Sequence, residues 1–263
     1  MIKLTHLSFA YDATDILRDL NLTFAKHKIT FLIGANGSGK TTLAHLLSGL
    51  IFPTSGEIYL DDLHLTRQTA NSLVRQKIGL VFQDPRNQIL FPKVSDDLRF
   101  TLENLHVPPA DIADRIRTSL QKTDMTAYLD ANPYHLSGGQ QQRVAIASQL
   151  SLQPDYLVLD EATSMLDLGG KRAIYRLLRR LRRDIGLIFI SNDLSELIYA
   201  DDVVILDQHQ ASKYPLRDIL RSPDILETHH LEIPFILQLA RQLHITDPAD
   251  LSESHILQKV AAL

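Results

Sequence analysis

Nine residues, 34–42 (GANGSGKTT), restrict the possible folds of this chain more than any other stretch. They fit the pattern G-x-x-x-x-G-K-S/T, with the apolar run KITFLI before them and the helix-forming LAHLLSGL after them. Glycines in such a loop let backbone N–H groups turn inward around phosphate oxygens, and the following helix N-terminus adds positive potential. Lys40 can then reach the β- and γ-phosphates, and the Thr41 hydroxyl suits Mg²⁺. The sequence therefore predicts a strand, a phosphate-binding loop and a helix in succession.

Short apolar runs recur along the chain with helical segments between them: residues 28–33, 77–82, 156–160, 186–191 and 202–206. Each run is apolar nearly throughout, as expected for strands that are covered on both faces. Strands that alternate with helices indicate an α/β fold with a mostly parallel sheet. Residues 2–9 and 20–24 alternate instead, which predicts an antiparallel β flap that residues 56–60 join. Together with the glycine loop, this pattern predicts a P-loop NTPase core.

The spacing of the runs predicts the domain organisation. About 70 residues separate the second run from the third, which is more than a normal crossover needs and predicts an inserted helical subdomain. We therefore expect a nucleotide-binding core of residues 1–84 and 155–212, a helical subdomain of residues 85–154, and a C-terminal helical extension of residues 213–263.

The chain after Leu206 is expected to be helical. In IPFILQLARQL, Pro234 lies near a helix start, and Phe235, Leu239 and Leu243 fall at helical spacing. This apolar stripe suits either pairing with a second chain or packing on its own domain.

A pair of carboxylates follows the third apolar run, in YLVLDEATSMLD. Asp160 is positioned to hold Mg²⁺ or its bound water, and Glu161 can orient and polarise an attacking water. Adjacent residues of an extended chain point to opposite sides, so the two carboxylates suit different roles. The alternative is a solvated acidic turn.

A second glycine motif, LSGGQ, precedes a segment that reads as a helix, and a helix that begins on two glycines and a serine is again an anion site. One nucleoside triphosphate needs a single cradle, yet this chain carries two. The simplest interpretation is that the second helix start faces a nucleotide held by another chain.

Composition limits the remaining possibilities. The net charge of −4 gives no general case for nucleic-acid binding, and the absence of cysteine excludes disulfides and thiolate metal sites and permits a cytosolic address. No stretch approaches the roughly 20 apolar residues that a membrane helix needs, so a membrane role is expected to come through a partner. Residues 171–183 carry seven basic side chains around an apolar stripe, which favours a solvated helix face over a phospholipid or nucleic-acid surface.

These motifs together resemble the ATP-binding subunits of ABC transporters. Besides the glycine motifs and carboxylates, the matching features are Tyr11 at the adenine-stacking position, Gln83 in VFQDP, SMLD at residues 164–167, and ISND where the family has its switch histidine. They occur in the family's order over roughly residues 1–210. The resemblance implies a head-to-tail dimer with two ATP molecules, each held between one chain's phosphate loop and the other chain's LSGGQ.

The resemblance also assigns roles to residues. The catalytic residues would be Glu161, Lys40, Gln83 and Asn192. ATP would contact Tyr11, Gly34, Asn36, Gly37, Ser38, Gly39, Lys40, Thr41 and Thr42 of one chain and Ser137, Gly138, Gly139 and Gln140 of the other. Mg²⁺ would be held by Thr41, Gln83 and Asp160.

Within the family, residues 83–105 (QDPRNQILFPKVSDDLRFTLENL) and the tail resemble the ATPases of energy-coupling factor (ECF) transporters, which import micronutrients. This implies a peripheral subunit on the cytoplasmic face of the cell membrane, paired with a second similar ATPase partly through C-terminal helices. The pair would lie beneath a transmembrane coupling subunit, beside a separate membrane substrate-binding subunit. A groove around residues 84–94 would receive coupling helices, and its apolar residues 89–92 suit either that contact or ordinary core packing.

Asn192 departs from the family's histidine. Asparagine still donates a hydrogen bond, but it is shorter and cannot become cationic. We therefore expect a roughly 10- to 1,000-fold loss in kcat at the site on this chain's own phosphate loop, with ATP binding less affected. This favours a heterodimer in which the opposite site turns over, although both sites can still be active if asparagine is tolerated.

Two other functions are compatible with the motifs. One is a regulatory subunit with little turnover, which Asn192 favours and the intact Lys40, Asp160 and Glu161 oppose. The other is a soluble ABC ATPase that acts in DNA repair or on ribosomes. The chain lacks the long coiled-coil insertion or second nucleotide-binding domain that such proteins usually show.

Overall fold

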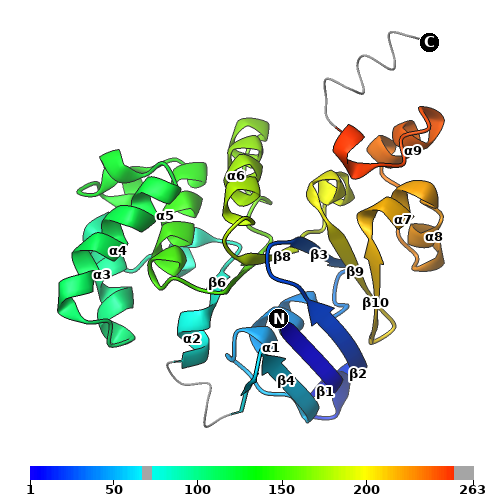
Figure 1. The fold of residues 1–263 in the computed structure, drawn as a ribbon, viewed down its shortest axis with the longest axis horizontal. Coiled ribbons are helices and arrows are strands. Elements are labelled where there is room, and N and C mark those ends of the chain that lie inside the picture. The colour runs from blue at the N-terminus through cyan, green and yellow to red at the C-terminus, as the bar shows by residue number, and fades with distance from the viewer. Residues whose placement is uncertain (67–72, 252–263) are drawn as a thin grey trace.

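The computed structural model describes residues 1–66 and 73–251, which form two sheets and a group of helices (Figure 1). Within these residues the larger sheet has six strands in the order β10-β9-β3-β8-β7-β6. Its strands are β3 (Ile29–Gly34), β6 (Ile78–Val81), β7 (Tyr156–Asp160), β8 (Gly186–Ile190), β9 (Asp202–Asp207) and β10 (Gln210–Pro215). All neighbours pair in parallel except β10, which is antiparallel to β9. The mostly parallel sheet predicted from the apolar runs is confirmed.

Both faces of this sheet are covered, which explains why its parallel strands read as continuous apolar runs. Phe31 of β3 and Phe189 of β8 pack with ring centroids 5.0 Å apart in a core that includes apolar residues of α6 (Leu168–Leu181). Their neighbours Leu32 and Ile190 belong to the core on the opposite face, with α1 (Lys40–Leu47).

The smaller sheet is the predicted antiparallel flap. It consists of β1 (Ile2–Tyr11), β2 (Thr14–Phe24), β4 (Ser55–Leu60) and β5 (Leu63–His64), in the order β2-β1-β4-β5. Its apolar face shares a core with α1 and the larger sheet. A short helix, α2 (Leu73–Lys77), leads into β6.

A separate group of helices lies between β6 and β7 in the chain, and Figure 1 draws it in green beside the larger sheet. It contains α3 (Val94–Asn104), α4 (Pro109–Lys122) and α5 (Gly138–Ser151). These helices share a buried cluster of their own, including Leu98, Ile116 and Val144. The opposite side of α5 contributes Ala145 and Ile146 to the core of the sheet, so α5 joins the two parts.

The chain after Leu206 is not wholly helical, contrary to the prediction. β10 forms the edge of the sheet before α7 (Leu216–Arg221), α8 (Ile225–Thr228) and α9 (Phe235–Gln242). Its sequence, QASKYP, lacks an apolar run, because an edge strand with partly exposed side chains does not need one. Residues 252–263, the end of the expected extension, lie outside the described residues.

The buried face of α9 also differs from the expected stripe. Pro234 caps the helix start as predicted, but Phe235 is 76% exposed. Leu237 and Ala240 are fully buried in the core of this chain, together with Leu243. The apolar side of α9 therefore packs on its own chain, and Phe235 is left on the surface.

Candidate active site

The phosphate loop connects β3 to α1, and its glycines are required by the chain itself. Gly34 has φ of +149°, and a Cβ there would lie 2.3 Å from the carbonyl oxygen of Leu206. Gly39 caps α1 with φ of +98°, and a Cβ there would lie 2.9 Å from the side chains of Ile16 and Leu17. Other residues would clash and be strained at both positions.

Lys40 lies at the start of α1 and is buried. Its ammonium donates hydrogen bonds to the carbonyl oxygens of Gly34 and Ala35, at 2.8 and 2.9 Å. Burial lowers the pKa of Lys40, while the carboxylates of Glu161 and Asp160 act in the opposite direction. The cation is thus held at the centre of the loop, close to both carboxylates.

Asp160 is the last residue of β7 and is buried, and its Oδ1 has no hydrogen-bond partner among the described residues. Burial raises the pKa of Asp160, and the neighbouring Thr41 hydroxyl and Lys40 ammonium counteract the rise. A buried carboxylate oxygen without a donor, next to a hydroxyl, suits Mg²⁺, which prefers a few oxygen ligands and retained waters. The residues present therefore fit the metal that the sequence predicts.

Glu161 has a left-handed backbone, with φ of +48°, and its N–H donates to the Ile190 carbonyl oxygen at 3.1 Å. Its carboxylate accepts one hydrogen bond on each oxygen, from Gln83 Nε2 to Oε2 at 2.9 Å and from Asn192 Nδ2 to Oε1 at 2.5 Å. The three residues follow β6, β7 and β8, which are neighbours in the sheet. The structure thus brings together Gln83, Glu161 and Asn192, as their positions after parallel strands imply.

The remaining residues that this chain's own ATP site is predicted to use lie in the phosphate loop, in the first turn of α1 and at the end of β1. Asn36, Gly37 and Thr41 are exposed on the loop and the first turn of α1, where Thr42 is half-buried. Tyr11, at the end of β1, is 48% exposed and packs edge-on against Phe9 at 4.7 Å. An exposed ring with a fixed orientation is available for stacking. Ser38 Oγ is buried and has no hydrogen-bond partner among the described residues.

The LSGGQ motif begins α5. Ser137 caps the helix, with its hydroxyl accepting from Gln140 N–H while Gln140 Oε1 accepts from Ser137 N–H at 2.9 Å. Gln140 also donates to the Tyr128 hydroxyl at 2.7 Å, so both ends of its side-chain amide are hydrogen-bonded within this chain. The motif borders a cavity of about 350 Å³ whose other walls come from Arg143 and residues 165–173 rather than from the phosphate loop. The two anion-binding helix starts therefore line different sites of this chain.

The glycines of LSGGQ differ from those of the phosphate loop. A Cβ on Gly138 would lie 3.7 Å from the Leu166 side chain, and a Cβ on Gly139 would lie 3.7 Å from Gly170 Cα. Both distances are ordinary van der Waals contacts, so this chain alone does not require glycine at either position.

Residues that the sequence analysis did not single out surround Glu161 and Asn192. The buried Glu196, in the turn of 3₁₀ helix at Leu194–Tyr199, accepts hydrogen bonds from Thr163 and Ser191 and forms an ion pair with Lys171. Lys171 belongs to the basic segment that was expected to form a solvated face. The only sequence signal for Glu196 was its place shortly after an apolar strand, and its burial could not be predicted from that place alone.

Comparison with known proteins identifies the family of this chain. Residues 17–164 match the family described as ABC transporter. The chain belongs to the ABC transporter family. It is 40% identical over 254 residues to the energy-coupling factor transporter ATP-binding protein EcfA1 of Mycoplasma mobile, which covers 94% of this chain and 92% of the relative. It is 38% identical over 247 residues to the protein of the same description in Listeria monocytogenes, covering 92% and 88%.

Solved ABC proteins share the fold. The structure of cbiO1 from Clostridium perfringens, described as part of the ABC transporter complex cbiONQ, superposes with a TM-score of 0.77 at 30% identity, covering 90% of this chain and 97% of that one. The ATP-binding cassette MJ0796, solved as a dimer in a post-hydrolysis state with ADP and Pi, gives 0.72 at 25% identity, covering 82% and 99%. As a family member, this chain binds a nucleotide and is an ATPase, and the predicted P-loop fold is confirmed.

Proposed function

We propose that this chain is an ATP-hydrolysing motor subunit of an ECF-type ABC importer, in which Glu161 activates water at the chain's own phosphate loop. The relatives described as ECF transporter ATP-binding proteins match nearly the whole chain, which supports this branch of the family. The proposal depends chiefly on one observation: the ends of three neighbouring strands place the Glu161 carboxylate between the amides of Gln83 and Asn192.

In the proposed reaction the phosphate loop orients the triphosphate, and Lys40 exchanges its bonds to Gly34 and Ala35 for phosphate oxygens. Glu161 accepts a hydrogen bond from the attacking water and aligns it with the terminal phosphoryl group. Gln83 and Asn192 fix the direction of that carboxylate. When bound through Thr41, Gln83 and Asp160, Mg²⁺ would neutralise charge that develops on the phosphate oxygens.

The second half of each site is proposed to come from another ATPase subunit. Gly138 and Gly139 are not required by the packing of this chain, whereas close approach of a partner-held phosphate to the start of α5 would require them. Gly139→Ala should therefore not lower the thermal stability of this subunit, and can raise it slightly, but should lower ATP turnover by the assembled complex. If turnover were unaffected, the proposed contribution in trans would be wrong.

Asn192 makes the two sites of the pair unequal in this proposal. Both donors to Glu161 are neutral amides, so the site on this chain's phosphate loop would be slow, and a partner that carries a histidine there would turn over faster. This favours a heterodimer. A regulatory subunit with little turnover is the second candidate, because the same pair of neutral amides holds both oxygens of Glu161.

The membrane partner is proposed to dock between the helical group and the core. A groove of about 290 Å³ is bordered by Leu50, Phe82, Leu90 and Phe100, of which Leu90 is 62% exposed. The neighbouring Ile89 is buried in the helical core and so serves core packing, while Leu90 is the side chain of this stretch proposed for the docking contact. No helix within the described residues is long and apolar enough to cross a bilayer. Attachment to the cytoplasmic face of the membrane would come through a transmembrane coupling subunit, beside a membrane substrate-binding subunit.

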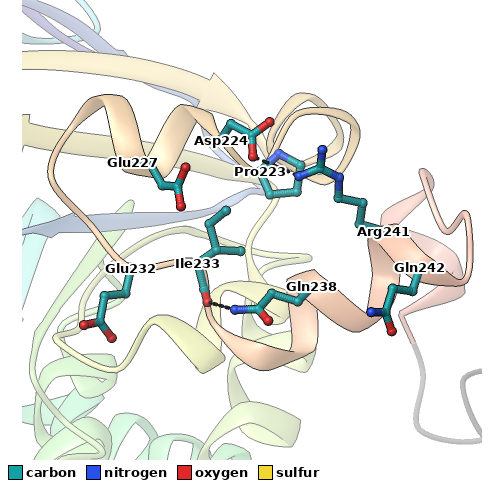
Figure 2. Close-up of a pocket in the computed structure, with 8 residues that line it drawn as sticks. All are labelled: Pro223, Asp224, Glu227, Glu232, Ile233, Gln238, Arg241 and Gln242. Atoms are coloured by element: carbon teal, nitrogen blue, oxygen red, sulfur yellow. Dashed lines mark hydrogen bonds and ion pairs between the residues drawn. The ribbon is translucent and has the colours of Figure 1, made fainter.

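The C-terminal extension is proposed to contact the partner ATPase. An open cavity of about 640 Å³ lies between α8 and α9, and Figure 2 shows the side chains that line it. Arg241 pairs there with Asp224 at 2.9 Å, and Gln238 donates to the Ile233 carbonyl oxygen at 2.8 Å. Phe235, at the start of α9, is exposed. An exposed aromatic ring on the same helix that lines a partly charged hollow suits a subunit contact.

The test of the proposed function is Glu161→Gln in the purified complex with its partner ATPase and membrane subunits. ATP hydrolysis at this chain's site should fall by roughly 100- to 1,000-fold, while ATP affinity stays within about threefold, because the carboxylate acts in the transition state. Glu103→Gln, on the exposed side of α3, is the matched control and should retain the parental rate. A parental complex that binds ATP without turnover at this site would favour the regulatory subunit.

A further inference from the structure

A buried carboxylate that takes no direct part in the proposed chemistry lies behind the active site. Glu196 is 3% exposed, and three groups share its two oxygens. Ser191 Oγ donates to Oε2 at 2.6 Å, Thr163 Oγ1 lies 3.0 Å from Oε1, and Lys171 Nζ lies 2.9 Å from Oε1. A buried carboxylate is costly unless it is paired and hydrogen-bonded in this way.

The two hydroxyl partners of Glu196 belong to the two segments that carry the active-site side chains. Thr163 lies two residues after Glu161, and Ser191 immediately precedes Asn192. Ser191 Oγ also accepts from Asp193 N–H at 3.0 Å, so its hydroxyl binds the backbone on the far side of Asn192 as well. One carboxylate therefore ties the turn after β7 to the turn after β8.

Lys171 adds a third tie from α6. Its ammonium donates to Asp193 at 2.8 Å as well as pairing with Glu196 at 2.9 Å. Burial acts to lower the pKa of Lys171, but Asp193 and Glu196 more than offset this and raise it. The group borders a cavity of about 290 Å³ that Glu161 and Asn192 also line, so its members lie next to the catalytic pair.

We propose that Glu196 is a positioning residue for ATP hydrolysis, which fixes the Glu161 and Asn192 turns relative to each other through Thr163 and Ser191. The inference rests on the proposed role of Glu161. In Glu196→Gln the amide nitrogen cannot accept from a hydroxyl and the charge opposite Lys171 is lost, so the two turns gain freedom. The phosphate loop, between β3 and α1, is untouched. Misalignment of a water-polarising group costs roughly 10- to 100-fold in rate.

The experiment compares kcat and ATP affinity in the complete complex for the parent, Glu196→Gln, Ser191→Ala and the double variant. Glu196→Gln should lower kcat about tenfold or more with ATP affinity changed less than about threefold, and the double variant should lose little beyond Glu196→Gln. Rescue is tested by Glu196→Asp, a shorter carboxylate that should recover part of the rate.

The matched control is Asp202→Asn, because Asp202 is also a buried carboxylate held by two lysines, Lys28 and Lys213, but lies at the opposite end of the parallel strands. Asp202→Asn should lower thermal stability, and any change in kcat should be matched by a similar change in ATP affinity. The inference is overturned if Glu196→Gln retains the parental kcat, or if its kcat and affinity fall together as stability does. Failure of the proposed function can be told apart from failure of this inference. If the proposed function were wrong, Glu161→Gln would leave the rate unchanged, whichever residue occupied position 196.

Discussion

Replacing Asn192 by histidine is expected to raise kcat at the site on this chain's phosphate loop. In the structure Asn192 Nδ2 donates to Glu161 Oε1 at 2.5 Å, and Gln83 donates to Oε2 at 2.9 Å. Both donors are neutral, so neither brings a positive charge toward the transferred phosphoryl group. An imidazole reaches further and can be protonated, so it can donate to the phosphoryl oxygens when negative charge shifts toward them.

The size of the effect follows from one hydrogen bond. A hydrogen bond to a charged group contributes about 1.5–3 kcal/mol, and about 1.4 kcal/mol corresponds to a factor of ten in rate. If the new bond forms mainly in the transition state, kcat should rise roughly 10- to 100-fold with little change in ATP affinity. Glu161 would keep its bond from Gln83, so its direction is maintained.

The assay is phosphate release by the complex in which the partner ATPase carries glutamine at the position equivalent to Glu161. Only the site on this chain's phosphate loop then turns over. Asn192→Gln is the control, because it lengthens the side chain and keeps a neutral amide. An unchanged maximal rate in Asn192→His would refute the reasoning, and equal rates for the histidine and glutamine variants would show that reach rather than charge is limiting.

Three further predictions concern the metal, the core and a buried acid. Asp160→Asn should lower Mg²⁺-dependent hydrolysis by roughly 100-fold and weaken nucleotide binding in Mg²⁺ more than in EDTA, as titration in both buffers would measure. Phe189→Ala should lower the free energy of unfolding by about 3–5 kcal/mol in urea, because Phe189 is fully buried between Phe31 and Tyr175. Burial raises the pKa of Asp97, so the folded state favours its protonated form. The contribution of Asp97 to the free energy of unfolding is therefore highest at low pH and falls as pH rises through its folded-state pKa. Asp97→Asn keeps the acceptor for the N–H groups of Leu90 and Phe91, so its stability relative to the parent should increase between about pH 4 and pH 7.

The sequence was most informative where local pattern and topology act together. Fully apolar runs predicted the parallel strands because both faces of that sheet are buried, and β3 and β7 lie close to the predicted residues. Parallel neighbours end at the same edge, so polar residues after β6, β7 and β8 had to lie close together. The contact of Glu161 with Gln83 and Asn192 follows from that geometry.

Prediction failed where a side chain's environment depends on distant segments. β10 is an edge strand and carries no apolar run, so the tail was expected to be helical throughout. Phe235 fits a helical stripe by its spacing, but the face of α9 that is buried in the core is the one that carries Leu237 and Ala240. Glu196 is an acidic residue shortly after a strand, and that sequence pattern is typical of a solvated turn. Only the tertiary fold shows that Thr163, Ser191 and Lys171 surround it.

The glycines of the two anion-binding motifs show how far one chain can explain its own sequence. Gly34 is fixed by the carbonyl oxygen of Leu206 and Gly39 by the side chains of β2, so the phosphate loop is a consequence of this fold. A Cβ added at Gly138 or Gly139 would meet nothing among the described residues closer than ordinary contact distance. Since glycine weakens a helix by about 0.5–1 kcal/mol relative to alanine, two of them at the start of α5 destabilise the isolated subunit. A requirement outside the chain, such as the phosphate of a nucleotide bound by a partner, would account for that cost.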